Sequence, residues 1–322
     1  MYEFCPDDQN RGRFQNSDGP QMVVQALALE DGGKVTACGA AAVAAAATRN
    51  EQIKEMFMDM GVDELLIHLL TKYSKDDEIL HVACDAIRSL VTDDDQRPAT
   101  SKVFRNAIRI VKGGAMDSIL AAFLQQPKSS PLLHILCTTL KCLAVNDEIC
   151  KEFSAQGGLD IMVQFFEYAI LHGNRAMAKS VCALLRQLAK SDTNKEAIVG
   201  RGVLKQIITM MTKFPDDRAI LQEAFVTVAS LTLRSPANAR KAVEAGAVDM
   251  AALIMGKYPC AAHLQRQGCQ MLRNLAVRNP ENRPVMIEKK LPDLIRKAKL
   301  AHHICYDVGA AALRDMGFDD YL

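Results

Sequence analysis

The sequence of 322 residues has no tryptophan, and its aromatic residues together make up only 5% of the chain. Side chains that could stack on bases are therefore scarce, which argues against a single-stranded nucleic acid as ligand. An excess of one charge is also missing, since 39 lysine and arginine residues face 38 aspartate and glutamate residues. The formal net charge of +1 gives no long-range field that would attract nucleic acid or an anionic membrane.

Long hydrophobic runs are absent as well. No apolar stretch approaches the roughly 20 residues of a transmembrane helix, and the alanine-rich run 39–47 is too short to span a bilayer. The first 20 residues are polar and lack the basic-then-apolar order of a signal peptide. We therefore expect no membrane contact and a cytoplasmic location, with the nucleus as the alternative.

Motifs for catalysis are missing too. The sequence has no G-x-S-x-G, no P-loop, no G-x-G-x-x-G after a strand and no H-E-x-x-H. The acidic cluster 93–95 and the scattered histidines fit a solvated surface better than a catalytic site. We therefore expect no enzyme, no cofactor and no bound metal. An enzyme built on a helical scaffold is the competing class, and it would require a pair of groups with shifted pKa values inside a closed pocket.

What the sequence does contain is an internal repeat of about 40 residues. A glycine opens an apolar helical stretch in six copies, and a lysine takes its place in the last one: Gly19, Gly61, Gly114, Gly158, Gly202, Gly246 and Lys290. The successive intervals are 42, 53, 44, 44, 44 and 44 residues. Such regularity is typical of a solenoid, in which each copy packs only on its neighbours. The long interval contains an insertion of roughly ten residues within 93–106. We expect this insertion to form an exposed loop or to lengthen the short helix of that copy.

Each copy predicts a short helix, a middle helix and a long third helix. Asn194 and Asn238 are suited to cap the short helix, and Gly202 and Gly246 are suited to form the tight turn after it. The third helix is clearest at 264–278, where a cysteine, two leucines and an alanine fall on one face of a 3.6-residue helix.

Four of the ten cysteines share one place in the third helix, six residues before a leucine: Cys84, Cys137, Cys182 and Cys269. A small, apolar, inward-facing side chain fits this place, so we predict buried, reduced thiols there. His302, His303 and Cys305 lie close together in the sequence. No second ligand cluster accompanies them, and we expect no zinc site.

The segments RNLAVRNPENR at 273–283, NKEAIVGRG at 194–202 and NARKAVEAG at 238–246, together with the three-helix rhythm, resemble armadillo repeats. The resemblance covers nearly the whole chain and implies an all-α, right-handed superhelical solenoid of three-helix repeats. It implies an armadillo solenoid over 19–322, with a partial first repeat and about six further repeats, which start near residues 50, 106, 146, 194, 238 and 282. Two-helix HEAT repeats have a similar period and are the alternative.

Residues 1–18 lack a convincing short helix, so we expect an irregular or disordered segment there. A solenoid needs a polar cap at its end, because each repeat buries its face only on its neighbours. Two alternatives remain: an abbreviated form of a longer family member, which we favour, or a cap in which residues 1–18 fold back.

A solenoid offers a binding surface, because its third helices lie side by side and line a groove. One position of the third helix is basic in five of six copies: Arg88, Lys141, Arg186, Arg273 and Arg314, with Ala229 as the exception. Gln187 and Asn274 lie beside this column, and Asn274 is expected to face away from the core. We take these seven polar residues as the candidate partner-binding site.

The basic column has two interpretations. Its residues can pair with neighbouring acids such as Asp85 or Glu223, or pack along adjacent helices. Alternatively, they can hold an extended, acidic or phosphorylated peptide, because guanidinium groups bind carboxylates and phosphates through paired hydrogen bonds.

We expect a protein–protein interaction scaffold or adaptor that binds a partner segment in the groove, and we do not expect nucleic acid as the partner. The alternatives are a HEAT-like binder of nucleic acid or ribonucleoprotein and a non-classical nuclear transport adaptor. Armadillo import adaptors that bind classical basic signals carry Trp and Asn in consecutive repeats. This chain lacks Trp and carries the Asn once.

Overall fold

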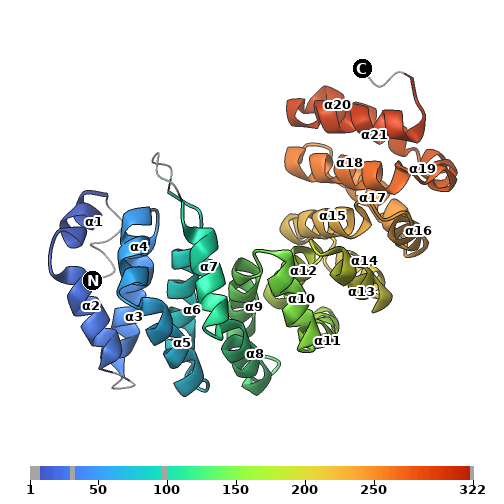
Figure 1. The fold of residues 1–322 in the computed structure, drawn as a ribbon. Helices are drawn as coiled ribbons and strands as arrows, with labels where there is room; N and C mark the ends of the chain where they lie inside the picture. The colour runs from blue at the N-terminus through green and yellow to red at the C-terminus, as the bar shows by residue number, and fades with distance from the viewer. Residues whose placement is uncertain (1–7, 30–32, 96–100, 320–322) are drawn as a thin grey trace. The chain divides into compact units, whose positions relative to one another are not determined.

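The computed structural model describes residues 8–29, 33–95 and 101–319 of the chain. All regular secondary structure in these ranges is helical, which confirms the all-α prediction (Figure 1). No helix in the same ranges is both long enough and apolar enough to cross a bilayer. The chain divides into two compact units, Met1–Ile149 and Cys150–Leu322.

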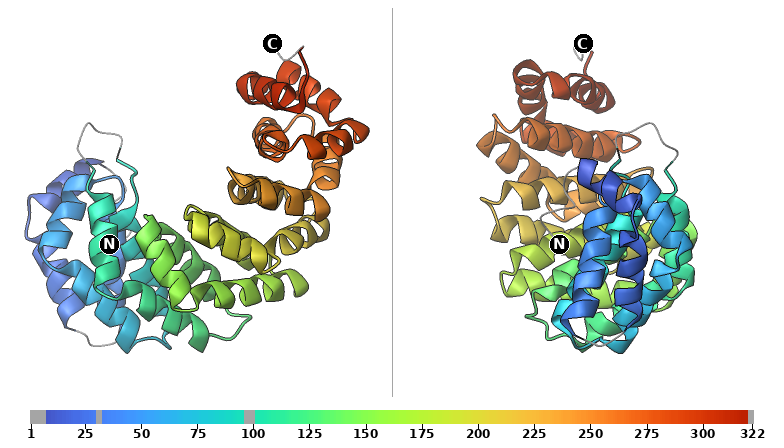
Figure 2. Two further views of the ribbon diagram at one scale, coloured as in Figure 1. Left: turned by 45° about the vertical axis from the view of Figure 1, so that its right-hand side comes forward. Right: turned by 90° about the vertical axis from the view of Figure 1, so that its left-hand side faces the viewer.

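The helices of the first unit come in sets of three. They are α1 (Asp8–Gln15), α2 (Gly19–Ala28), α3 (Lys34–Ala47), α4 (Glu51–Asp59), α5 (Val62–Lys72), α6 (Asp77–Val91), α7 (Val103–Lys112), α8 (Ala115–Gln125) and α9 (Leu132–Leu143). The third helices α3, α6 and α9 pack on one another in succession, and so do the middle helices α2, α5 and α8. This arrangement forms two parallel rows within the unit (Figure 2).

The second unit continues the same order, and α10 (Asp147–Ala155) spans the point of division. The helices that follow are α11 (Gly158–Leu171), α12 (Arg175–Leu188), α13 (Asp192–Gly200), α14 (Val203–Lys213), α15 (Arg218–Thr232), α16 (Pro236–Glu244), α17 (Ala247–Lys257), α18 (Ala262–Ala276), η1 (Pro280–Asn282), α19 (Arg283–Glu288), α20 (Leu291–Ala301), η2 (His303–Cys305) and α21 (Tyr306–Met316). The third helices α12, α15, α18 and α21 form one row, and each packs on the next.

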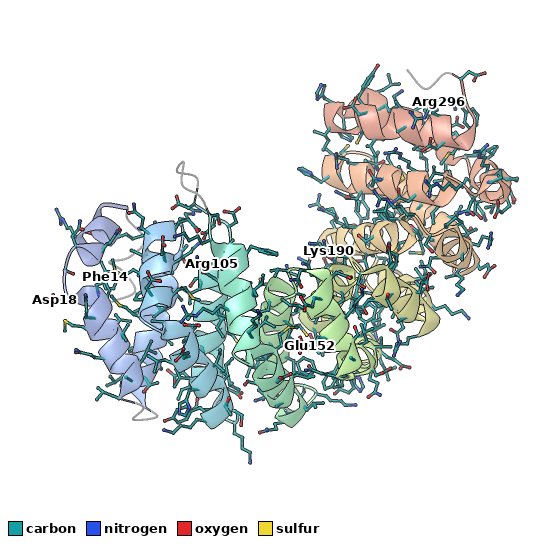
Figure 3. The ribbon with its side chains drawn as sticks, viewed as in Figure 1. Phe14, Asp18, Arg105, Glu152, Lys190 and Arg296 are labelled. Carbon is teal, nitrogen blue, oxygen red and sulfur yellow. The ribbon has the colours of Figure 1, made fainter. Side chains whose placement is uncertain are left out.

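The first repeat has a short helix, which the sequence analysis did not expect. Helix α1 occupies Asp8–Gln15, so the expectation of an irregular segment is wrong for these residues, while residues 1–7 lie outside the described ranges. The rings of Phe14 and Phe57 lie 6.4 Å apart, and a side chain at Gly19 would collide with Phe14 (Figure 3). A single aromatic anchor therefore holds a helix whose other residues are mostly polar.

The turn between the short and middle helices depends on one residue in the left-handed conformation. Its φ angle lies between 57° and 99° at Gly61, Gly114, Gly157, Gly202, Gly246 and Lys290. In the fourth copy the left-handed residue is Gly157, and Gly158 opens α11 as predicted, at a place where a Cβ would lie 2.5 Å from the Phe153 ring. Glycine favours these turns because it has no Cβ to clash at positive φ.

The short helices α13 and α16 are capped by serine, where the sequence predicts asparagine. Ser191 and Ser235 accept hydrogen bonds from the backbone N–H groups of Asn194 and Asn238, which lie inside the first turn. The Asn238 side chain instead donates to the carbonyl oxygen of Leu231 at 3.0 Å. Leu231 is near the end of α15, where carbonyl groups lack an intrahelical partner, so the buried asparagine satisfies one of them.

The described ends of the insertion are held against α4. The backbone N–H of Glu51 donates to Asp95 at 3.0 Å, and the N–H of Lys102 donates to Glu51 at 3.3 Å. Lys54 also forms an ion pair with Asp94 at 2.7 Å. Residues 96–100 lie outside the described part of the chain, so the expected loop remains a prediction there.

The four repeat-related cysteines are buried, as predicted: Cys84, Cys137, Cys182 and Cys269. Burial raises the pKa of the thiols of Cys84, Cys182 and Cys269 to about 12, and it raises the pKa of Cys137 as well. A neutral thiol in an apolar interior packs as a small hydrophobic side chain.

Candidate functional site

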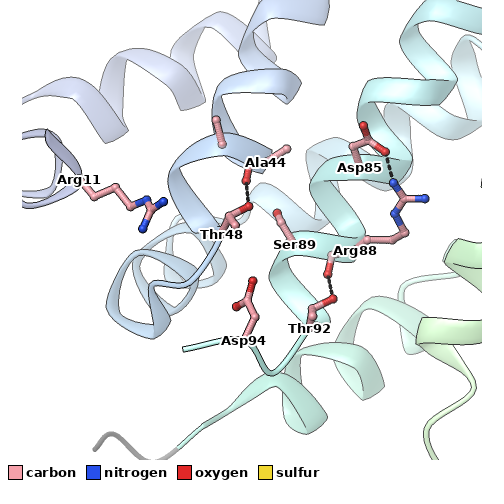
Figure 4. A pocket seen from close by; sticks show the side chains of 9 residues that line it. Arg11, Ala44, Thr48, Asp85, Arg88, Ser89, Thr92 and Asp94 are labelled. Carbon is pink, nitrogen blue, oxygen red and sulfur yellow. Dashed lines mark hydrogen bonds and ion pairs between the residues drawn. The ribbon is translucent and has the colours of Figure 1, made fainter. Parts of the chain in front are cut away.

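In the first unit, the basic column is represented by Arg88 on α6 and Lys141 on α9. Both side chains are half-buried, and Arg88 forms an ion pair with Asp85 one turn earlier (Figure 4). Among the described residues, Lys141 has no ion pair. Within the first unit, the basic column therefore consists of one neutralised cation and one cation without an ion pair among the described residues.

A hollow of about 460 Å³ lies beside Arg88. Its charged lining residues are Arg11 from α1, Arg88, Asp85 and Asp94 (Figure 4). Two arginines and two aspartates balance, so the charged lining of this hollow has no net charge.

In the second unit, the basic column forms ion pairs between neighbouring repeats. Arg186 Nε on α12 lies 2.7 Å from Glu223 Oε1 on α15. Arg273 Nε on α18 lies 3.1 Å from Asp315 Oδ2 on α21, and Arg314 binds the other oxygen of the same carboxylate at 3.1 Å. These contacts match the structural interpretation of the column, in which the arginines pair with acids on the next helix.

The two amide residues of the candidate site differ in exposure. Gln187 is half-buried, whereas only 7% of Asn274 is exposed. The Asn274 amide donates to the carbonyl oxygen of Ala229 at 2.8 Å and accepts a hydrogen bond from Gln270 at 3.2 Å. The expectation that Asn274 faces away from the core is therefore wrong. Ala229 lies in the last turn of α15, and its carbonyl also accepts a longer hydrogen bond, of 3.4 Å, from the Thr232 hydroxyl.

A second hollow, of about 170 Å³, lies where α15 and α18 end. Its lining residues are Thr232, Leu233, Arg234, Ser235, Pro236, Gln270, Arg273, Asn274, Val277 and Arg278. Three of these are arginines and none is acidic, so the hollow is positively charged.

Arg234 and Arg278 are not among the residues predicted from the sequence, because the basic column follows one face of the third helix and these two lie in the turn behind it. Both are exposed and directly precede the N-cap of the next short segment, at Ser235 and Asn279. Lys190 holds the same place before Ser191 and is also exposed (Figure 3). A basic residue directly before Ser191, Ser235 and Asn279 is the signal that the sequence offers.

No family model matches the chain. The human protein named armadillo repeat-containing protein 6 is 31% identical to it over 236 residues, which are 70% of this chain and 46% of that protein. The homolog from Drosophila melanogaster is 27% identical over 222 residues, which are 68% of this chain and 46% of that protein. The chain thus spans about half the length of the curated relatives it matches.

Among solved structures, an engineered protein matches with a TM-score of 0.82 at 18% identity, over 98% of this chain and 72% of the other. A designed armadillo repeat protein matches with a TM-score of 0.63 at 16% identity, over 80% of this chain and 99% of the other. The repeats of this chain are armadillo repeats. A structure concerning the cadherin–β-catenin interaction also shares the fold, with a TM-score of 0.53 at 14% identity over 98% of this chain and 68% of the other.

The armadillo repeats of the second unit are also joined on the face away from the candidate site. Arg201 binds Asp160 at 2.7 Å, and Lys257 binds Asp216 at 2.7 Å, in each case 41 residues apart. The hydrogen bond from Arg201 lowers the pKa of the Asp160 carboxyl, and the bond from Lys257 lowers that of Asp216. Both carboxylates are exposed, so each pair adds little to stability.

The residues considered for zinc contact the neighbouring armadillo repeat. His302 Nε2 lies 2.7 Å from the carbonyl oxygen of Pro259, and the buried Cys305 thiol points toward the carbonyl of Ala262. Within the described part of the chain, no three His, Cys, Asp or Glu residues are grouped as metal ligands.

Proposed function

We propose that the chain is a protein–protein interaction scaffold or adaptor, and that the third helices of its armadillo repeats bind an extended segment of a partner protein. The observation that carries this proposal is the row of half-buried charged side chains on α12, α15, α18 and α21. The fold is shared with a structure concerning the interaction of β-catenin with cadherin, which a phosphorylation switch controls. The proposed compartment is the cytoplasm.

The residues proposed to bind the partner are those of the basic column and its neighbours: Arg88 and Lys141 in the first unit, and Arg186, Gln187, Arg273, Asn274 and Arg314 in the second. Arg186 and Arg273 use their Nε edge for the neighbouring carboxylate. A carboxylate or phosphate of the partner would approach the outer edge of the same guanidinium group. Asn274 would act through Gln270, whose amide it orients at 3.2 Å.

The spacing of the third helices suits an extended chain. Packed helices lie about 8–10 Å apart, and an extended peptide advances about 3.3 Å per residue. Roughly three residues of a partner would therefore pass each repeat. Arg186 and Arg273 belong to helices two repeats apart, so they would contact partner residues about six positions apart.

The mixed charge of this surface favours a protein over a nucleic acid as the partner. Glu223 and Asp315 lie among the arginines, and their side chains are 16% and 12% exposed. A nucleic acid is negatively charged along its whole length, so these carboxylates would repel it. A protein segment can alternate acidic and polar residues and so avoid this repulsion. Nucleic acid binding would instead be recognised by a steep dependence of affinity on salt.

The test is the double variant Arg186→Gln with Arg273→Gln. Partners captured from a cell lysate by the intact chain are identified, purified and titrated against both proteins. Each exposed contact contributes about 0.5–1 kcal/mol, so the double variant should bind roughly 5- to 30-fold more weakly. Its circular dichroism spectrum should match that of the original chain.

The matched control is Arg201→Gln with Arg240→Gln, which removes two exposed arginines that pair with Asp160 on α11 and Glu281 in η1, outside the third helices. This control should bind the partner as tightly as the original chain. Equal binding by both double variants would show that the third helices are not the binding surface.

A further inference from the structure

The hollow at the ends of α15 and α18 gathers more positive charge than the ion pairs at its edge neutralise. Arg234, Arg273 and Arg278 line it from two successive repeats, with Gln270 and Asn274 beside them. We propose that this hollow is a subsite for a phosphate monoester carried by the partner segment. The inference rests on the proposed function, because it names the chemical group that the partner presents to the second unit.

The backbone at Arg234 and Arg278 adopts an unusual conformation. Both residues adopt the left-handed conformation, with φ of 57° and 60°. Each follows the C-cap of a third helix, where glycine is the usual left-handed residue because it has no Cβ. A positive charge near a helix C-terminus is favourable, but this effect is smaller than the strain of a left-handed arginine. Arg49 adopts the same conformation after α3, so the left-handed turn belongs to the repeat, and the position beside the hollow is what sets Arg234 and Arg278 apart.

Arg273, the third arginine of the hollow, is bound by an acidic residue of the neighbouring repeat. Arg273 Nε bonds to Asp315 at 3.1 Å, and Asp315 is shared with Arg314. One carboxylate thus compensates two guanidinium groups, and Asp315 itself does not line the hollow. The positive charge of Arg273 is only partly neutralised where it faces the hollow.

The polar residues beside the arginines are fixed by internal hydrogen bonds. Thr232 donates to the carbonyl of Val228 at 2.8 Å, and Asn274 donates to Ala229 at 2.8 Å. Gln270 in turn donates to Asn274. The wall of the hollow is therefore ordered, so an incoming anion would not have to fix these side chains before binding.

The charge of the hollow suits a phosphate monoester better than a carboxylate. A phosphorylated side chain carries a charge of about −1.5 to −2 at neutral pH and offers three acceptor oxygens. Three guanidinium groups can donate to these oxygens in parallel pairs, whereas a single carboxylate satisfies about one guanidinium. The hollow also has no aromatic lining residue, so it offers no platform on which a nucleic acid base could stack.

The hollow of the first unit provides a natural comparison. Its two arginines, Arg11 and Arg88, share the space with Asp85 and Asp94. An anion would meet two carboxylates there. The proposed subsite is therefore specific to the second unit, where the turn arginines line the hollow and acidic residues are missing from its lining.

The test is a titration of the intact chain, followed through the arginine Nε–Hε signals in an NMR spectrum. The probes are inorganic phosphate, a short alanine peptide with one phosphoserine, the same peptide with serine, and single-stranded oligothymidylate. We expect saturable shifts of Arg234, Arg273 and Arg278 with phosphate and with the phosphoserine peptide. Binding of the phosphoserine peptide should be at least about tenfold tighter than binding of the serine peptide.

The decisive variants are Arg234→Gly and Arg278→Gly, which remove the side chain while glycine retains the left-handed turn. Each variant should fold, and its affinity for the phosphoserine peptide should be lower by about tenfold or more. The matched control is Arg49→Gly, because Arg49 has φ of 56° in the equivalent turn after α3 but does not line the hollow. This control should bind the phosphoserine peptide like the original chain.

Three outcomes would overturn the inference: no saturable shift in the original chain, equal binding by the arginine-to-glycine variants, or tighter binding of the oligonucleotide than of the phosphoserine peptide. Failure of the proposed function is separate, because it is measured by partner capture with the Arg186 and Arg273 variants. If those variants lose the partner while phosphoserine does not bind, the scaffold function stands and the phosphate subsite is rejected.

Discussion

The ammonium group of Lys195 lies 3.0 Å from the carbonyl oxygen of Leu233, the C-cap residue of α15. Leu233 belongs to the same repeat, 38 residues further along the chain. Lys54 makes the same contact with Thr92, which ends α6 and is also 38 residues away. In both units, a lysine from a short helix thus binds the last carbonyls of the next third helix, where the helix dipole places negative partial charge.

The first prediction concerns the more buried of these lysines. The Lys54 side chain is 0% exposed and binds the carboxylates of Glu51 and Asp94 at 2.8 and 2.7 Å. Lys54→Met should lower the free energy of unfolding by about 3–5 kcal/mol, because both acids lose their shared cation. Urea unfolding followed by circular dichroism measures the change.

Lys195→Met should have a smaller effect, about 1 kcal/mol, because its acidic partner Asp192 is largely exposed. Lys205→Met, at an exposed site on α14, serves as the control and should change stability by less than about 0.5 kcal/mol. Equal stability of all three variants would contradict the role assigned to the buried ammonium group.

The second prediction concerns Asn274. Asn274→Ala removes the shorter of two hydrogen bonds to the carbonyl of Ala229 and leaves the 3.4 Å bond from Thr232. The loss of one buried hydrogen bond costs about 0.5–1.5 kcal/mol, so the variant should be less stable by this amount. Amide hydrogen exchange in α15 and α18 should become faster, while exchange in the first unit should not change.

A suitable comparison for Asn274→Ala is Gln270→Ala, which keeps the bond from Asn274 to Ala229 and removes only the outer contact. It should change stability by less than about 1 kcal/mol, because Gln270 is half-buried. If the two variants are equally unstable, the hydrogen bond to Ala229 is not the reason for the burial of Asn274.

The third prediction uses two glycines that are two residues apart. Gly202 has φ of 78°, so Gly202→Ala should destabilise the protein by about 1–2 kcal/mol. Gly200 ends α13 without positive φ, and a Cβ there would have no neighbour within 4 Å. Gly200→Ala should therefore stabilise the protein by about 0.5–1 kcal/mol. Melting temperatures that shift in the same direction for both variants would contradict the assigned turn.

The fourth prediction concerns thiol reactivity. Burial raises the pKa of Cys84, Cys182 and Cys269 to about 12, and the reactive thiolate is therefore scarce. At about pH 8, a thiol reagent should label the exposed Cys38 and Cys260 quickly and the buried thiols only after unfolding. Mass spectrometry of the labelled protein distinguishes the sites, and fast labelling of Cys182 in the folded chain would contradict the prediction.

The same pKa shifts predict the direction of a pH effect. The folded state holds these thiols neutral, whereas in the unfolded chain they ionise near the ordinary value of 9.0. Their contribution to stability is complete below that pH and is lost as the pH rises from there toward 12. Cys182→Ala should reduce this loss of stability at high pH. At neutral pH, the variant should be less stable by about 1 kcal/mol.

Much of the architecture was predictable from local patterns in the sequence. The repeat period, the three helices in each repeat and the burial of Cys182 and its equivalents all depend on spacing within one repeat. Hydrophobic periodicity decides which face of a helix is buried, and glycine frequency marks the turns. These signals extend over a few turns of helix, so they can be recognised without knowledge of the neighbouring repeat.

The tertiary structure alone decided how polar side chains are used. Arg186 meets Glu223 after 37 residues, and Asn274 meets the Ala229 carbonyl 45 residues earlier. Phe14 holds α1 against the second repeat through Phe57. Each of these contacts joins neighbouring repeats, and its geometry depends on how two helices pack. A polar residue on the flank of a single helix is compatible with either burial or exposure, and only the adjacent helix determines which occurs.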